Sequence, residues 1–395
     1  MTADLDGAPL AAEDLEAALR PFGESRLLPR SAYVERSVFD WEERHFFRGG
    51  WMCVGRSEDV AQVGDQRAEP VGGTGVFLVR AEDRRLRAFA NVCRHRGHEL
   101  LPCGESVHRP IVVCPYHSWS YRLDGSLRNA PRFDEWDAFV PEDNGLVELP
   151  CEEWLGLVFV ATTGPTVALR EHFAMLEPLV AAHEPGRLRR ATRHDYVVQA
   201  NWKVIIENYQ ECYHCPMIHP ELCAVSPPRS GENYRVAGAG AWVGGWMALR
   251  DGAQTMSLTG HSGGTGLRGL DARERREVLY LVLFPNVLLS LHPDYVMTHV
   301  LRPIGPERTA VGCTWSFAPE DLERPEFDPS YAVDFWDITN GQDFSACESV
   351  QRGLASEHWA PGPLAPDEDG LYQFVTMVAR AYEGLAVRAG GLPVA

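Results

Sequence analysis

Two pairs of cysteine and histidine stand out in the first third of the chain. Cys93 and His95 are separated by one residue, Cys114 and His117 by two, and eighteen residues lie between the pairs. Four such donors could hold a tetrahedral zinc ion. They could also hold a [2Fe–2S] cluster with both cysteines on one iron and both histidines on the other. Spacing alone leaves these two readings open, beside a third in which buried thiols and histidines bind no metal.

A polar patch near the middle of the chain is predicted to lie on a helix. Apolar residues recur at helical spacing from about Asn201, and Pro216 is expected to end the helix one residue earlier. Glu207, Glu211 and His214 are spaced by four and three residues, so we predict that they share one helix face.

His219 should lie just past this helix, where a turn can bring it beside His214. Two histidines and one carboxylate form the usual ligand set of non-haem Fe(II) oxygenases, which leave metal positions open for O2. An amphipathic helix with a polar end is the alternative. Cys212 and Cys215 could form a redox or zinc pair, but we predict that they are core thiols.

These segments resemble one protein family. Residues 91–100 and 114–121 resemble the two loops of the Rieske domain in ring-hydroxylating oxygenase α subunits, and residues 201–220 resemble the mononuclear iron motif of the same Rieske non-haem iron oxygenases. The resemblance covers roughly residues 45 to 355. It implies these ligands: Cys93 and Cys114 on one iron of a [2Fe–2S] cluster, His95 and His117 on the other, and His214 and His219 on a separate Fe(II).

The carboxylate ligand must come from elsewhere in the chain. Residues 340–354 resemble the family's late helix, in which an aspartate completes the iron site, and this match assigns Asp343. Glu348 and Asp337 are the fallback candidates, which we otherwise expect to be solvated helix charges.

The resemblance also implies how the two metal sites cooperate. A separate reductase or ferredoxin would supply electrons from NAD(P)H, since the chain has no flavin or dinucleotide motif, and O2 would be the co-substrate. Electrons would pass between neighbouring subunits of a head-to-tail homotrimer. Glu211 would bridge His214 of its own chain and His117 of a neighbour, which would also fix the imidazole tautomer. Asn208 is a further catalytic candidate.

Glu211 stands where ring dioxygenases usually have aspartate. Glutamate at this place resembles the quaternary ammonium oxygenases of the glycine betaine and stachydrine type, as do residues 283–295 and 336–343. An ammonium substrate would favour aromatic faces around it, although aromatics at such spacings are also typical of a core. The candidates for the pocket are Trp242, Trp246, Phe284, Tyr295 and Trp315.

The leading functional hypothesis is therefore a terminal oxygenase that demethylates or hydroxylates beside the nitrogen of a quaternary ammonium compound. An aromatic-ring hydroxylating dioxygenase is the alternative within the family. A Rieske electron carrier and a hydrophobic-ligand binding protein are the alternatives from other classes, and two intact metal motifs argue against both.

The elements that must position these residues indicate an α+β architecture. We predict an N-terminal helical arm over residues 1–45, a small β-rich Rieske domain over 46–163, and a mononuclear iron domain over 164–395 with a helix-grip antiparallel sheet. The predicted helices are Ala11–Leu19, Phe335–Leu354 and Tyr372–Val387. The predicted strands of the second domain are Tyr196–Val198, Val278–Phe284, Val287–Leu291, Tyr295–Leu301 and Ala310–Phe317.

Composition excludes several classes. The net charge of −18 disfavours nucleic acid, which needs a basic surface. No apolar stretch is long enough for a transmembrane helix, and residues 1–20 lack the order of a secretory signal, so we expect a cytoplasmic protein. Ten cysteines in 395 residues do not indicate a disulfide framework.

Overall fold

The computed structural model describes residues 7–133, 135–163, 167–235 and 240–387. The chain divides into two compact units. The small unit is Glu43–Val167, and the large unit combines Met1–Glu42 with Ala168–Ala395.

The small unit is built from short antiparallel strands in three sheets. Their orders are β1-β11-β10, β5-β2-β3-β4-β9 and β6-β7-β8. A core that includes Phe77, Phe89 and Trp119 lies among them. The strands are β1 Met52–Arg56, β2 Asp65–Val71, β3 Thr74–Arg80, β4 Leu86–Ala90, β5 Ser106–His108, β6 Val112–Val113, β7 Ser120–Tyr121, β8 Leu127–Asn129, β9 Glu148–Leu149, β10 Cys151–Trp154 and β11 Leu157–Val160.

The large unit contains one seven-stranded antiparallel sheet in the order β12-β18-β17-β16-β15-β14-β13. Every residue of β16 is buried, as expected for an apolar run without polar alternation in a sheet covered on both faces. The predicted strands are confirmed, and four of them extend beyond the predicted bounds at one end. The strands are β12 Arg189–Val198, β13 Glu232–Asn233, β14 Trp242–Ala248, β15 Glu277–Leu283, β16 Val287–Leu291, β17 Tyr295–Gly305 and β18 Arg308–Phe317.

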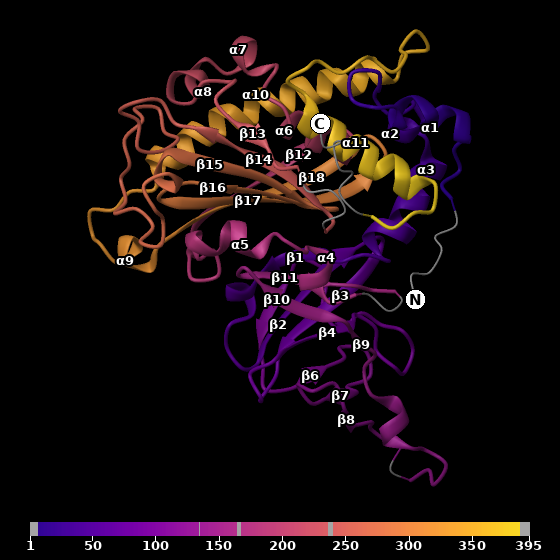
Figure 1. Cartoon of the computed structure of the whole chain (residues 1–395). Helices are drawn as coiled ribbons and strands as arrows, with labels where there is room; N and C mark the ends of the chain where they lie inside the picture. The colour runs from indigo at the N-terminus through magenta and orange to yellow at the C-terminus, as the bar shows by residue number, and fades with distance from the viewer. Residues whose placement is uncertain (1–6, 134, 164–166, 236–239, 388–395) are drawn as a thin grey trace. The chain divides into compact units, whose positions relative to one another are not determined.

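Helices cover this sheet, with α10 and α11 lying across one of its faces (Figure 1). Helix α6 packs against both of these helices and against β17. The α+β class predicted from the sequence is confirmed. The helices are α1 Ala12–Leu19, α2 Ser31–Val34, α3 Arg36–Glu42, α4 Leu169–His172, α5 Glu177–Val180, α6 Trp202–Tyr209, α7 Cys215–Ile218, α8 Pro220–Val225, α9 Pro319–Leu322, α10 Ser330–Leu354 and α11 Asp369–Tyr382.

Helix α10 positions one functional side chain by its periodicity. Its buried residues include Phe335, Trp336 and Thr339, which recur at the spacing of one helix face. Asp343 follows Trp336 by seven residues, or two turns, so it lies on the same side of the helix.

A buried ion pair joins α6 to the N-terminal arm. The Lys203 Nζ lies 2.5 Å from Glu42 Oε1, and both side chains are fully buried. Glu42 also accepts hydrogen bonds from Trp202 Nε1 and from the Tyr382 hydroxyl of α11. A buried carboxylate with a cation and two further donors is fully satisfied, so this cluster connects α3, α6 and α11.

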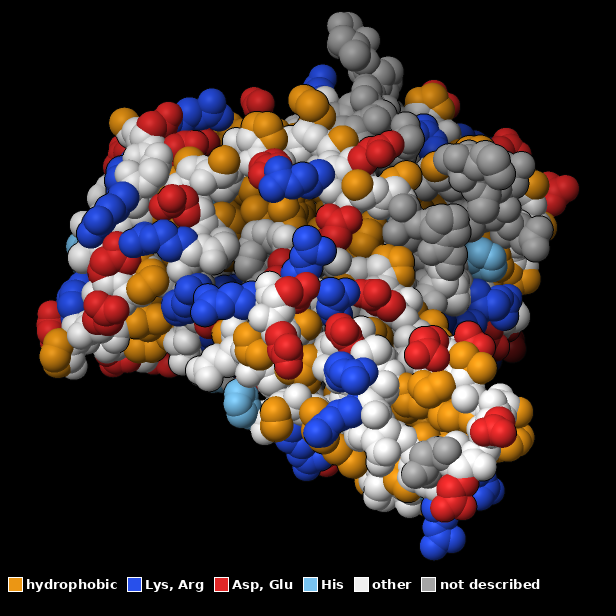
Figure 2. Space-filling model, turned by 90° about the horizontal axis from the view of Figure 1, so that it is seen from below, with side chains coloured by type: hydrophobic (Ala, Val, Ile, Leu, Met, Phe, Trp, Pro, Cys, Tyr) orange, Lys and Arg blue, Asp and Glu red, His pale blue; other side chains and the backbone are white. Residues whose placement is uncertain are grey.

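The surface shows acidic and basic side chains interspersed over the face seen in Figure 2. None of the described helices has both the length and the apolar character that crossing a membrane requires.

Breaking the buried pair should be costly. Lys203→Met leaves the Glu42 carboxylate buried without its cation, and we expect the free energy of unfolding to fall by about 3–5 kcal/mol. Urea unfolding followed by tryptophan fluorescence measures this. Arg36→Ala is the matched control, because the Arg36–Asp40 pair is exposed and should contribute less than about 1 kcal/mol. Equal losses in the two variants would contradict the assignment.

His183 should make stability fall in acid. Burial lowers the pKa of this histidine to about 4, so the unfolded chain binds more protons below pH 6.5 and stability is lost as the pH falls. Between pH 6.5 and 5, wild type should lose about 1 kcal/mol per pH unit relative to His183→Gln. Urea unfolding at several pH values tests this, and parallel pH profiles of the two proteins would rule it out.

Candidate metal and substrate site

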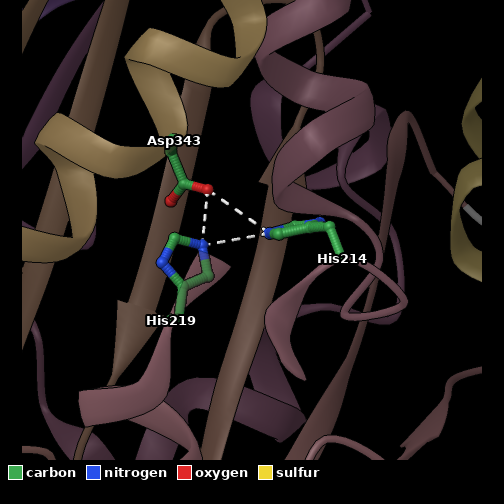
Figure 3. Close-up of side chains that lie close together, drawn as sticks. All are labelled: His214, His219 and Asp343. Carbon is green, nitrogen blue, oxygen red and sulfur yellow. Dashed lines mark hydrogen bonds and ion pairs between the residues drawn. The ribbon is translucent and has the colours of Figure 1, made fainter. Parts of the chain in front are cut away.

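Two histidines and one aspartate of the large unit converge on a common point (Figure 3). His219 Nε2 lies 2.8 Å from Asp343 Oδ1 and 3.1 Å from His214 Nε2, and His214 Nε2 lies 3.3 Å from the same aspartate oxygen. Among the described residues, this is the group of at least three possible ligands whose donor atoms lie within 4.8 Å of one another. The donor set fits a non-haem Fe(II) ion with open positions.

The helix predicted to carry Glu207, Glu211 and His214 on one face ends earlier than expected. Helix α6 stops at Tyr209, and a new helix, α7, begins at Cys215. The Glu211 carboxylate accepts hydrogen bonds from the backbone N–H groups of residues 213 and 214. Such side-chain bonds compete with the helical ladder, so Glu211 and His214 lie in a loop and the predicted helical face is wrong.

Both imidazoles are oriented by hydrogen bonds at Nδ1. His214 Nδ1 lies 2.5 Å from Glu211 Oε1, and His219 Nδ1 lies 2.7 Å from Gln342 Oε1. An Nδ1–H donated to each oxygen leaves Nε2 as the atom available to a metal. Gln342 was missed from the sequence, and its place directly before Asp343 was the signal that could have found it.

The three side chains of this group shift one another's pKa values. Burial opposes protonation of His214, but Asp343 and Glu211 outweigh it and raise its pKa to about 9. The pKa of His219 is also raised, and that of Asp343 is lowered by the two histidines despite burial. Because a metal binds neutral imidazole, iron binding must displace protons here.

A cavity of about 460 Å³ opens at this group. Asn208 and Glu211 contribute to its wall beside the three possible ligands. An aromatic wall of Tyr209, Tyr280 and Trp336 lines it as well, with the Tyr280 ring edge-to-face to the other two at 6.0 and 6.4 Å. The charged residues of the lining, besides the group itself, are Glu211, Arg229, Glu232, Arg235, Asp367 and Asp369.

The aromatic residues predicted for the pocket are placed differently. Trp246 lines the cavity. Trp242 is buried and its Nε1 donates to a backbone carbonyl of residue 174, Phe284 packs on the ring of Trp202, and Tyr295 donates to the backbone of residue 256. Trp315 is likewise buried in the core. These four belong to the core, so their prediction as pocket residues is corrected.

The fallback carboxylates have other partners, in keeping with the choice of Asp343. Asp337 accepts hydrogen bonds from the Tyr196 hydroxyl and pairs with His194. Glu348 accepts the backbone N–H of residue 199. Neither residue lines the cavity.

Cys212 and Cys215 form a disulfide across the loop that carries His214. Both cysteines line the cavity. Cys215 belongs to the hydrophobic core of this unit and Cys212 packs against it, as predicted, but their prediction as thiols is wrong because the two side chains are bonded to each other.

The two Cys-His pairs of the small unit occupy facing loops. The ring centroids of His95 and His117 lie 4.7 Å apart. The buried Cys93 and Cys114 thiols are hydrogen-bonding neighbours, and the Tyr121 hydroxyl lies 3.2 Å from Cys93 Sγ. The two histidines therefore lie next to each other, and the two cysteines lie next to each other.

This pairing fits a two-iron cluster better than zinc. His95 Nδ1 is buried and has no hydrogen-bond partner in the part of the chain that the structure describes, which suits a nitrogen that binds metal. Zinc would gather all four donors within about 4 Å of one another. The close group found among described residues includes none of the four, whereas two separate pairs match a [2Fe–2S] cluster with one pair on each iron.

Comparison with known proteins matches both units. Residues 50–148 match the model of the Rieske [2Fe-2S] domain, and residues 185–384 match that of the ring hydroxylating alpha subunit (catalytic domain). The chain therefore belongs to the Rieske non-haem iron oxygenases and is an oxygenase (α) subunit. The match to a catalytic domain excludes the simple electron carrier, and an oxygenase subunit implies a separate reductase.

Its relatives include oxygenases of quaternary ammonium compounds. The glycine betaine monooxygenase oxygenase subunit of Chromohalobacter salexigens is 30% identical, over 96% of this chain and 92% of that one. The carnitine monooxygenase oxygenase subunit of Acinetobacter baumannii is 38% identical, over 90% and 94%. The solved structure of a quaternary ammonium Rieske monooxygenase, described as giving insights into carnitine oxidation and inter-subunit electron transfer, is 26% identical with a TM-score of 0.80, covering 95% of this chain and all of that one.

Removing one histidine should empty the mononuclear site alone. We expect His219→Ala to lower the iron content from about three to about two per chain, because the two cluster irons remain, and to keep the visible spectrum of the Rieske cluster. Iron analysis and absorption spectroscopy measure both. His194→Ala is the control, since His194 pairs with Asp337 outside the cavity. A variant that keeps three irons would show that His219 is not a ligand.

Proposed function

We propose that this protein is the oxygenase component of a monooxygenase that oxidises a carbon beside the nitrogen of a quaternary ammonium compound. The observation that carries the proposal is the cavity, which combines the His214, His219 and Asp343 group with an aromatic wall and an acidic surplus. The quaternary ammonium monooxygenases among the relatives support the same substrate class.

The charge of the cavity favours a cation. Its described lining holds five aspartates and glutamates against two arginines and no lysine. One of those arginines, Arg229, is already paired with Asp367 at 2.8 Å. With a divalent iron bound, the net charge of the lining would still not be positive. The lining therefore attracts an ammonium group electrostatically.

The aromatic wall supplies the second element of recognition. A quaternary ammonium group donates no hydrogen bond, so it is held by the negative faces of aromatic rings. Tyr209, Tyr280 and Trp336 are arranged edge-to-face beside the possible metal ligands. The Tyr209 hydroxyl lies 2.8 Å from Ser290 Oγ, which fixes the orientation of that ring.

The roles of the ligands follow from the donor geometry and from the family. Cys93 and Cys114 would hold one iron of the cluster and His95 and His117 the other. His214, His219 and Asp343 would hold the mononuclear Fe(II), which supplies the activation of O2 when bound. Glu211 and Gln342 keep the two imidazoles in the tautomer that presents Nε2. The cavity wall would hold the substrate carbon near this point.

Electron delivery would involve a second copy of the chain. We infer a head-to-tail homotrimer in which Glu211 faces His214 of its own chain and His117 of a neighbour, with electrons reaching the cluster from a separate NAD(P)H-dependent reductase. The Glu211 carboxylate already contacts His214, which is the half of this bridge that lies within one chain. Its side chain is 12% exposed. The inter-subunit electron transfer described for the solved relative supports this arrangement.

The product identifies the reaction. Oxidation of an N-methyl group releases formaldehyde and leaves a tertiary amine, whereas oxidation of a chain methylene releases trimethylamine and leaves an aldehyde. With a generic reductase and NADH, we expect one of these products to match O2 uptake for glycine betaine, carnitine or choline. Formation of ring diols from an aromatic acid, without either of these products, would contradict the proposal of a quaternary ammonium substrate.

Tyr280 should contribute through its ring face. For Tyr280→Leu we expect the KM for the ammonium substrate to rise about 5- to 30-fold, the equivalent of about 1–2 kcal/mol for a desolvated cation–π contact. The neutral isostere, in which carbon replaces the ammonium nitrogen, provides the control, and its inhibition constant should change much less. Equal weakening of both ligands would mean that Tyr280 acts by shape alone.

A further inference from the structure

The Cys212–Cys215 disulfide encloses a possible iron ligand. The two bonded cysteines are three residues apart, with Tyr213 and His214 between them. Residues 210–214 form neither helix nor strand. The disulfide is therefore a covalent restraint on this loop, beside the Glu211 hydrogen bonds and the backbone hydrogen bond from the N–H of Cys215 to the carbonyl of Cys212.

The disulfide is also reachable from the cavity. Both cysteines belong to the cavity lining, and Cys215 Sγ lies 3.9 Å from His214 Nε2. A small oxidant or reductant that enters the cavity thus meets this pair beside the place where His214 would bind iron.

We propose that Cys212 and Cys215 form a redox-active site that a peroxide oxidises and a dithiol reduces, and that the disulfide state retains the mononuclear iron. The inference rests on the proposed ligand role of His214. The oxidised state carries the assembled group of His214, His219 and Asp343, so the closed loop is the form that is ready for metal.

The chemistry of both directions balances. In oxidation, one thiolate attacks a peroxide oxygen to give a sulfenic acid and one water, and the second thiol displaces a further water as the S–S bond forms. In reduction, a dithiol attacks one sulfur to give a mixed disulfide, and its second thiol completes the exchange, leaving two cysteine thiols and an oxidised dithiol. Two electrons and two protons are transferred each way.

Opening the disulfide has two consequences for His214. The loop regains conformational freedom that the cross-link removes, so His214 is held less firmly opposite Asp343. A free Cys215 thiol also lies beside the ligand nitrogen and can compete for the ion. Both effects weaken iron retention, and neither involves the small unit's own ligands.

The test compares iron retention in the two states of the loaded protein. Samples are treated with hydrogen peroxide or with a phosphine reductant that does not chelate iron, then desalted. Alkylation and mass spectrometry count the thiols in the peptide that contains both cysteines, and the release of mononuclear iron to a chelator is timed. We expect reversible gain of two thiols and iron release at least about fivefold faster in the reduced state, with the cluster spectrum unchanged.

Variants separate the pair from other thiols. The double variant Cys212→Ser/Cys215→Ser should release iron at one rate in both treatments, faster than oxidised wild type because its loop has no cross-link. Cys223→Ser, which removes a free thiol of the nearby α8, should behave as wild type. Equal release rates in both states of wild type, or a peptide whose thiols do not interconvert, would overturn the inference. The test measures iron release and not turnover. Its result therefore does not depend on whether the substrate is a quaternary ammonium compound.

Discussion

The large unit depends on one constraint, the meeting of three donor atoms within about 3 Å that come from distant segments. His219 and Asp343 are 124 residues apart in sequence, yet their donor atoms lie 2.8 Å apart. Such a meeting requires that helix α10 and the loop after α6 hold fixed positions against the same sheet. The buried Glu42 and Lys203 pair joins α6 to α3 and α11, so the start of the ligand loop is anchored in the core.

Local hydrogen bonds orient the ligand side chains that the fold brings together. The carboxylate of Glu211 has two functions, since it ends the helical course of the chain and orients His214. Gln342 orients His219 from the residue next to Asp343. These hydrogen bonds leave both Nε2 atoms available to a metal. The loop that carries His214 also carries the disulfide, so retention of the metal is linked to the redox state of the two cysteines.

The sheet could be predicted from the sequence because it depends on local patterns, whereas the ligand sets, Asp343 included, were implied by the resemblance to the family. Cys-His spacing and apolar runs bounded by turn residues are readable without tertiary contacts. The end of α6 was not, because it depends on whether the Glu211 side chain bonds to the backbone or points away. Trp242 and Trp246 share a strand face, but they lie about 13 Å apart along it, so one reaches the core and the other the cavity. Periodicity predicts a face and cannot say which part of that face is covered.

The central claim, that a quaternary ammonium group binds beside iron held by His214, His219 and Asp343, can be tested in one spectroscopic measurement. Nitric oxide added to the reduced protein forms an adduct with Fe(II) that electron paramagnetic resonance detects apart from the Rieske cluster. We predict that a trimethylammonium substrate changes the adduct signal, that its neutral isostere changes it far less, and that His219→Ala abolishes it. An adduct signal that persists in this variant, or that no ammonium compound alters, would contradict binding of an ammonium group beside this iron.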